Sequence, residues 1–385
     1  MLSYIDSQYS NTLTFLKELV EQNSFTENPA GVNKVQELLQ AKLLDLSMQV
    51  ERIPRDGKGD ALIARTDLAQ KLLKTKERSQ ILLSGHADTV YPPNSDFKHF
   101  SDDKVNCYGP GVMDMKGGLV VMMLALQALK HKELLHQIPI SVLVIPDEET
   151  GSRSSVDLLQ SEAERAKAAL VFEWGRSEDK IITKRRGNSF WKLSVKGVTA
   201  HSGNEHKKGA NAIVQISHTI SRLSALTDYK RGITVNVGTI KGGSARNVVP
   251  DRAEALFEIR MASKEDHAEL LLKVEGIVKD IVVPNTKVTA KETRLSPPMQ
   301  ETEQARVLFK EYQSFAEQSG LKYNDVASII GGASNANTLS YYGAPTIDGL
   351  GPFGEHAHSE REYARLDSFL PKAKNAALWL ASKVL

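Results

Sequence analysis

Hydrophobic and polar positions follow two different patterns in the first half of the chain. Short continuous apolar runs are typical of strands buried on both faces of a sheet, and amphipathic stretches are typical of surface helices. The predicted strands are residues 80–85 (QILLSG), 140–146 (ISVLVIP) and 168–174 (AALVFEW). The predicted helices are residues 12–22, 31–46, 117–131 and 154–166. This alternation predicts an α/β fold with a mostly parallel sheet flanked by helices.

The pattern changes after residue 185. Strands are predicted at residues 188–198, 232–240, 253–261 and 286–294, with helices at 209–226 and 263–281. The order βαββαβ is that of a ferredoxin-like α+β module. Alternation of the first kind then returns, with predicted helices at 303–320, around 335–343 and at 366–385, and strands at 325–332 and 344–351. We therefore expect one α/β domain, residues 1–185 plus 294–385, with a small domain of residues 186–293 inserted into it.

Length, charge and cysteine content narrow the classes to which this protein can belong. The 385 residues are enough for two domains with separate cores. A net charge of +2, from 49 basic and 47 acidic residues, gives no electrostatic reason to expect a nucleic-acid partner. Cys107 is the only cysteine, which excludes an intramolecular disulfide and a thiolate metal cluster.

Targeting segments are also not expected. The first 20 residues contain Asp6 and lack a basic start leading into an apolar core, so they do not resemble a secretory signal. No uninterrupted apolar stretch approaches the ~20 residues that a membrane span needs. The sequence therefore predicts a cytoplasmic protein with no membrane association.

Histidines and carboxylates follow four of the predicted strands. Open α/β sheets place their sites at the carboxyl ends of the strands, so these side chains are expected to converge. Taken singly, each has an ordinary explanation, such as a surface histidine, a solvated glutamate pair or a helix cap. The residues concerned are His86 and Asp88, then Asp147, Glu148 and Glu149, then Glu173, then His356, His358 and Glu360, together with Asp114 from a glycine-rich loop.

A divalent cation resolves the conflict that such a group creates. Several unpaired carboxylates at a buried edge would repel one another and lose hydration. Histidines and carboxylates without a thiolate suit zinc, manganese or cobalt. Asp114 could bridge two ions, each with one histidine and one terminal carboxylate, as in two-metal hydrolytic sites. Asp88 would then accept the other ring N–H of His86 and orient that ring.

Seven segments in order along the chain resemble the motifs of the metallopeptidase-twenty family. They are GHADTVYP (85–92), GPGVMDMKGG (109–118), PDEETGS (146–152), FEW (172–174), TAHSG (199–203), NVVP (247–250) and HAHSEREY (356–363). This family includes glutamate carboxypeptidase, the aminoacylases, acetylornithine deacetylase and succinyl-diaminopimelate desuccinylase. The resemblance covers almost the whole chain and implies a zinc-exopeptidase-like catalytic domain with an inserted lid, or dimerisation, domain.

The resemblance implies a role for each metal-site residue. His86 and Glu173 resemble ligands of one metal, Glu149 and His358 ligands of the other, and Asp114 the bridging ligand. Glu148 occupies the position of the family's general base, which deprotonates water and later protonates the leaving amine. His356 is the alternative to His358, which is preferred because HSEREY matches the family's histidine–polar–acidic pattern.

Further residues are implied to act on substrate. His201 resembles a lid histidine that crosses a dimer interface and stabilises the oxyanion in the partner's site, and Asn247 a lid asparagine that contacts substrate. Arg260 and Arg294 are candidate anchors for a substrate carboxylate, with surface salt bridges as the alternative. Gly331 and Gly332 could let substrate backbone approach closely, or form a simple strand-end turn. His201 could instead be a capping residue.

The predicted function is that of a homodimeric dizinc amidohydrolase, most similar to glutamate carboxypeptidase. It would cleave the amide next to a free carboxylate in a small peptide or N-acyl amino acid, using two divalent ions, zinc first and cobalt or manganese as alternatives. An N-acyl amino acid deacylase with the same motifs is the alternative, and a non-catalytic binding protein on this fold would have lost Glu148. Asn335 stands where relatives often carry an aspartate, and Glu173 favours the peptidase and aminoacylase branches.

Overall fold

The computed structural model describes residues 1–75, 77–176, 180–322 and 332–384. Two compact units can be distinguished in it. The first contains Met1–Lys184 and most of the chain from Glu301 onward, and the second, called the lid below, contains Arg185–Gln300. The sequence pattern predicted an inserted domain of residues 186–293.

The first unit is built on a six-stranded sheet. In spatial order its strands are β1 (Gln49–Ile53), β2 (Ala61–Arg65), β6 (Ile140–Ile145), β3 (Gln80–His86), β7 (Ala166–Val171) and β14 (Thr346–Ile347). Strand β3 runs parallel to β6 and β7, and β14 runs parallel to β7. The predicted α/β fold with a mainly parallel sheet is confirmed.

The antiparallel edge formed by β1 and β2 was not predicted. Strand β1 has the sequence QVERI and is exposed or half-buried along its whole length. It therefore lacks the apolar run that revealed the buried parallel strands. The predicted strand at 325–332 lies almost entirely outside the described residues.

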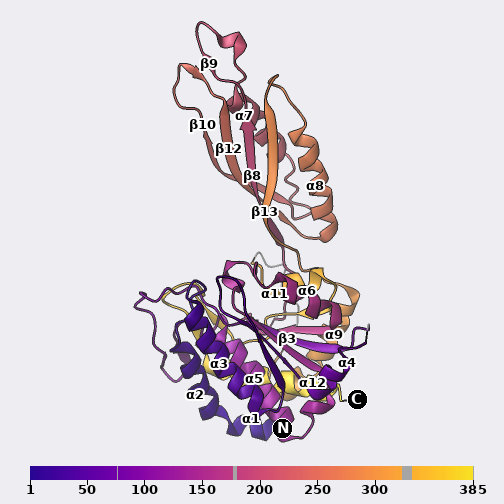
Figure 1. Cartoon of the computed structure of the whole chain (residues 1–385). Coiled ribbons are helices and arrows are strands. Elements are labelled where there is room, and N and C mark those ends of the chain that lie inside the picture. Colours follow the sequence, from indigo (N-terminus) through magenta and orange to yellow (C-terminus); the bar gives the residue numbers. More distant parts are fainter. Residues whose placement is uncertain (76, 177–179, 323–331, 385) are drawn as a thin grey trace. The chain divides into compact units, whose positions relative to one another are not determined.

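Helices cover both faces of this sheet. Figure 1 shows α5 (Lys116–His131) and α12 (Phe369–Ala381) on one side of the strands and α6 (Val156–Arg165) and α11 (Asn335–Tyr341) on the other. Leu83 of β3 packs in the core cluster around α5, whereas its neighbour Leu82 points to the opposite face and is also fully buried. The other helices are α1 (Leu2–Ser7), α2 (Tyr9–Val20), α3 (Pro29–Asp45), α4 (Asp67–Leu72), α9 (Glu303–Gln313) and α10 (Ala316–Ser319).

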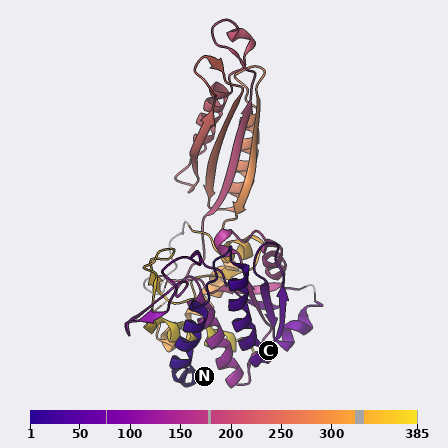
Figure 2. The same ribbon diagram turned by 60° about the vertical axis from the view of Figure 1, so that its left-hand side comes forward.

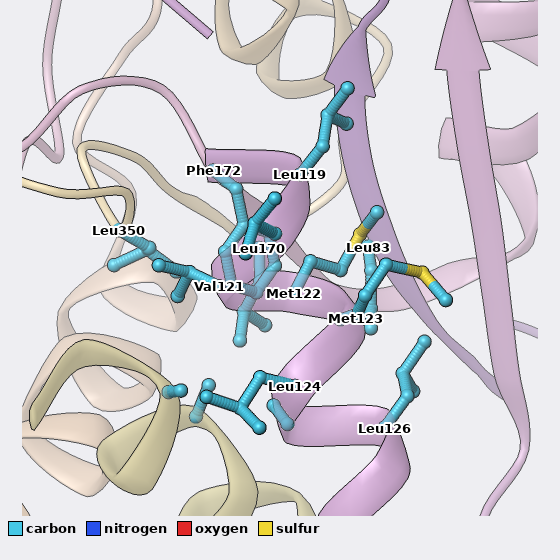
Figure 3. Close-up of a cluster of buried hydrophobic side chains, with 14 of the residues drawn as sticks. Leu83, Leu119, Val121, Met122, Met123, Leu124, Leu126, Leu170, Phe172 and Leu350 are labelled. Atoms are coloured by element: carbon cyan, nitrogen blue, oxygen red, sulfur yellow. The ribbon is translucent and has the colours of Figure 1, made fainter. Parts of the chain in front are cut away.

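Helix α5 is apolar around its whole circumference, which explains its position. Nearly every residue from Lys116 to Leu129 is buried. Figure 3 shows Met122 and Met123 beside Leu83 of the sheet, within a cluster of large apolar side chains. Burial of one such side chain contributes roughly 1.5–3 kcal/mol. This helix therefore anchors the glycine-rich loop that precedes it to the sheet.

A small antiparallel sheet joins two distant parts of the first unit. Its strands, in spatial order, are β15 (Gly354–Glu355), β16 (Tyr363–Arg365), β5 (Asn106–Tyr108) and β4 (Ser101–Asp102). Strands of two or three residues leave no pattern in a sequence, and none was predicted here. The pairing of β5 with β16 brings the glycine-rich loop after β5 next to the histidine-containing loop between β15 and β16.

The lid has the predicted βαββαβ order. Its sheet contains β10 (Thr234–Gly242), β12 (Arg252–Met261), β8 (Gly187–Lys196) and β13 (Lys287–Ser296), all antiparallel to their neighbours. Helices α7 (Ala212–Ser224) and α8 (Lys264–Val278) cover one face (Figures 1 and 2). Alternating burial along β8 and β12 leaves the other face open. A separate pair, β9 (Ala200–His201) and β11 (Val248–Val249), completes the lid.

Both lid helices begin at asparagine or serine caps. The Asn211 side chain accepts hydrogen bonds from the first turn of α7, and Ser263 forms a capping box with Asp266 at the start of α8. Such caps contribute about 1 kcal/mol each. In the described ranges, no helix has the combination of length and apolar character needed to cross a bilayer.

Candidate metal centre and active site

The structure brings the five predicted metal ligands together at the carboxyl edge of the sheet in the first unit. Each comes from a different element, so the cluster is assembled by the fold. Four of the side chains are nearly buried, and the fifth, His358, is 55% exposed. The five are His86 at the end of β3, Asp114 in the loop before α5, Glu149 in a short 3-10 turn after β6, Glu173 just after β7, and His358 between β15 and β16.

The carboxylate of Asp114 lies between two histidine–glutamate pairs. Its Oδ1 is 3.3 Å from His86 Nε2, which in turn is 3.6 Å from Glu173 Oε1. Its Oδ2 is 3.3 Å from His358 Nε2, which is 3.1 Å from Glu149 Oε2. Each histidine–glutamate pair forms a set of candidate metal ligands, called a donor group below. The two donor groups share the Asp114 carboxylate, with one of its oxygens in each group.

Buried polar atoms that lack a hydrogen bond indicate that a metal ion fits this site. Among the described residues, His86 Nε2 and Glu149 Oε1 are buried and make no hydrogen bond, although His86 Nε2 lies 3.3 Å from Asp114 Oδ1. Buried polar atoms without a partner are costly and rare in native structures. Ligand atoms of His86, Asp114 and Glu149 all lie within 4.8 Å of one another. The nitrogen and oxygen donors fit divalent metal ions of the zinc, manganese or cobalt type.

The electrostatics of the cluster also favour cations. Burial raises the pKa of Glu148 to about 8 and, together with the negative charge of Asp114, that of Glu149 to about 7. Contacts with Asp114 and Glu149 raise the pKa of His358 to about 11. The cluster thus concentrates negative charge in a place with little water, and a positive ion would stabilise the ionised carboxylates.

Asp88 links the first histidine to the glutamate pair. Its Oδ1 is 3.2 Å from His86 Nδ1 and accepts a hydrogen bond from Glu148 N at 3.1 Å. Its Oδ2 accepts from Glu149 N at 3.2 Å and from Thr26 Oγ1 at 2.7 Å. Because Asp88 is fully buried and these contacts occupy both oxygens, it orients the surrounding residues and is not itself free for a metal.

The structure separates the two candidate histidines of the HAHSEREY segment. His358 points to Asp114 and Glu149, whereas the ring of His356 packs edge-on against Tyr363 with centroids 6.0 Å apart. Both residues have positive φ angles, 66° for His356 and 62° for His358. This conformation costs of order 1–3 kcal/mol for a residue with a side chain and is concentrated at functional sites.

Residues outside the predicted set also support the site. Glu362 and Tyr91 are buried and hydrogen-bonded to each other, and both were overlooked in the sequence although they lie within the quoted motifs. Asn335 is fully buried; its Nδ2 donates to Gly85 O and its Oδ1 accepts from Ser152 Oγ, each at 3.3 Å. Asn335 therefore lies beside the end of β3 and contacts no metal ligand through these bonds.

His201 and Asn247 lie next to each other in the lid. His201 is exposed at the end of β9, and its Nδ1 accepts hydrogen bonds from Gly203 N and Asn204 N, each at 3.2 Å. Ser202 N donates to Asn247 O at 3.1 Å, so the two predicted substrate residues share one strand pair. No described residue forms a hydrogen bond with the other ring nitrogen of His201, Nε2.

The two predicted arginines lie on the open face of the lid sheet. Arg260 and Arg294 pair with Asn188 and Phe190, which are two residues apart on β8 and therefore face the same side. Arg260 Nε donates to Glu258 at 3.2 Å, and the guanidinium of Arg294 lies 5.6 Å from the centre of the Phe190 ring. Both have neighbours within the lid that orient them.

The glycine pair can be placed only in part. Gly331 lies outside the described residues. Gly332 O accepts a hydrogen bond from Arg185 Nη1 at 3.1 Å. This contact is compatible with the simple turn that was the alternative to a substrate role.

Comparison with known proteins finds two matching family models and full-length relatives. The family model of the peptidase dimerisation domain matches residues 183–286, and the model of peptidase family M28 matches residues 68–227. Carboxypeptidase G2 of Pseudomonas sp. (strain RS-16) is 28% identical over 373 residues, covering 96% of this chain and 87% of the relative.

Solved structures share the fold over nearly their full lengths. Aminopeptidase PepT from Bacillus cereus ATCC 10987 superposes with a TM-score of 0.77 at 23% identity, covering 97% of this chain and 99% of the other. A dinuclear metal-binding peptidase of the M20 family from Bacillus subtilis superposes with a TM-score of 0.68 at 14% identity, covering 98% of each chain. The chain belongs to the metallopeptidase M20 family, which is the metallopeptidase-twenty family of the sequence motifs.

Proposed function

We propose that this protein is a two-metal hydrolase that cleaves the amide bond next to a free carboxylate in a small peptide or N-acyl amino acid. The observation that carries the proposal is the carboxylate of Asp114 shared by two histidine–glutamate pairs, with Glu148 beside them. The carboxypeptidase class is supported by similarity to carboxypeptidase G2 along almost the whole chain.

The donor groups define which residues would hold the metals. His86 and Glu173 would hold one ion, Glu149 and His358 the other, and Asp114 both. When bound, two divalent ions, zinc in the first instance, polarise the scissile carbonyl and lower the pKa of water.

Glu148 is the residue that we propose moves the proton. Its carboxylate makes no hydrogen bond or ion pair with the described residues, although it neighbours Glu149, and burial raises its pKa above the ordinary value of a glutamate. In our proposal Glu148 accepts the proton of the attacking water and returns it to the leaving amine. Asp88, through its bonds to the Glu148 and Glu149 amides, holds this turn in place.

A substrate panel tests this function. Peptides with a free C-terminal glutamate should be cleaved with release of that amino acid, and their C-terminally amidated counterparts should react far more slowly. Chelation should abolish the activity, and Zn²⁺, Co²⁺ or Mn²⁺ should restore it. Faster hydrolysis of acetyl amino acids would identify the deacylase alternative, and equal cleavage of free and amidated peptides would contradict a carboxylate requirement.

In the lid, we propose that His201 donates a hydrogen bond to the developing oxyanion and that Asn247, Arg260 and Arg294 contact substrate. The match of residues 183–286 to a dimerisation domain supports a homodimer, and we propose that His201 serves the partner subunit in it. In an isologous dimer each site would then borrow one histidine from the other chain.

Mixed dimers test this sharing. Glu148→Ala and His201→Ala should each be inactive alone, whereas co-expression should restore roughly a quarter of wild-type activity, because half of randomly paired dimers are mixed and each has one complete site. Differently tagged chains would show that mixed dimers form. Activity that stays at the level of the single variants in purified mixed dimers would show that His201 acts within its own chain or not at all.

A further inference from the structure

We infer that Glu362 is a positioning residue that holds the shared ligand Asp114 in place from its main-chain side. This inference rests on the proposed metal-binding role of Asp114. Glu362 Oε1 accepts hydrogen bonds from Met113 N at 2.9 Å and from Asp114 N at 3.0 Å. The loop that carries Asp114 is neither helix nor strand, so these contacts determine where its backbone lies.

The second oxygen of Glu362 is also fully used. Oε2 accepts from Gly111 N at 3.0 Å and lies 2.8 Å from the hydroxyl of Tyr91. An ionised carboxylate has about four acceptor positions, and four donors are present. Glu362 is completely buried and belongs to the same loop as His358, yet it has no lone pair left for a metal.

The same contacts join the two ligand loops. His358 lies four residues before Glu362, and the Tyr91 hydroxyl is also 2.9 Å from the carbonyl oxygen of Ser359, the residue after His358. Asp114 and His358, which face each other across the site, are therefore anchored to one buried hydrogen-bond network. A buried carboxylate is costly unless it is paired or hydrogen-bonded, and here three amide N–H groups and one hydroxyl supply the compensation.

Glu362→Gln removes the negative charge and one of the two acceptor oxygens with little change in volume, so some of these donors lose their acceptor. The amide nitrogen of glutamine donates hydrogen bonds, so in either orientation it faces a backbone donor: Gly111 N–H, or Met113 N–H and Asp114 N–H. The Tyr91 hydroxyl can accept from this nitrogen, because its own proton can go to Ser359 O. We expect the loop to shift and the affinity for both ions to fall by about 10–100-fold, the range typical when partners of ligands are lost. Both ions are affected because Asp114 serves both donor groups.

The measurement is a competition titration of the full-length protein with Zn²⁺ and a chromophoric chelator, well below the unfolding midpoint of each variant. Glu360→Gln, an exposed glutamate of the same loop, is the matched control and should bind both ions as the wild type does. Glu149→Gln should weaken only one ion. Tyr91→Phe removes one of the four donors and should weaken both ions to a smaller extent.

The outcomes separate positioning from simple stability. A folded Glu362→Gln protein that binds two ions with wild-type affinity, even with a lower Tm of the metal-free form, would overturn the inference, as would loss of one ion only. If Glu362→Gln does not fold, Tyr91→Phe is measured in its place. Wild-type affinity of Tyr91→Phe for both ions, or loss of one ion only, would then overturn the inference. A wild-type protein that binds no divalent ion would overturn the proposed function and this inference with it.

Discussion

Replacing Glu148 with glutamine is expected to lower kcat by about 10²–10⁴-fold, the usual contribution of a general acid–base residue, while both metal ions stay bound. The amide has the same size as the carboxylate but cannot accept the proton. Because the Glu148 carboxylate belongs to neither histidine–glutamate pair, metal binding should not depend on it. The measurements are kcat on the best substrate and metal content after desalting.

The neighbouring variant Glu149→Gln is the control for this result. Its carboxylate lies 3.1 Å from His358 Nε2, so its loss should release one ion and leave the other. If both variants lost metal equally, and activity fell only in proportion to the metal lost, the assignment of base and ligand within this pair would be wrong.

Asp114→Asn is expected to have the largest effect on metal content. One carboxylate serves both donor groups, so replacing it with a neutral amide should release both ions. Metal polarisation contributes several kcal/mol to such reactions, and activity should therefore fall by about 10³-fold or more. Metal analysis after gel filtration, compared with the exposed control Asp96→Asn, tests this expectation. Retention of two tightly bound ions by folded Asp114→Asn would contradict the shared-ligand arrangement.

The parallel strands and their exits were predictable from the sequence because both signals are local. The apolar runs of β3, β6 and β7 reflect burial on both faces, and parallel strands end at one edge of the sheet. The residues that follow these strands, His86, Glu149 and Glu173, were therefore expected to converge. The βαββαβ order of the lid was readable in the same way.

The weakly patterned elements were not predictable. Strand β1 is too exposed to show an apolar run, and β5 and β16 are too short to show any period, although their pairing places Asp114 beside His358. Such strands form because a partner from a distant part of the chain is held nearby by the rest of the core.

The sequence by itself identified the side chains that the fold gathers at the candidate metal centre, because donor type and position near a strand end are properties of a short segment. The motif already favoured His358 over His356, and the tertiary structure shows His358 facing the carboxylates. Only the tertiary structure revealed that Asp88 and Glu362 accept hydrogen bonds from the loops that carry the ligands. The physical reason is that the role of a buried carboxylate depends on which groups donate hydrogen bonds to it. The donors to Glu362 lie about 250 residues away along the chain, and only folding brings them together.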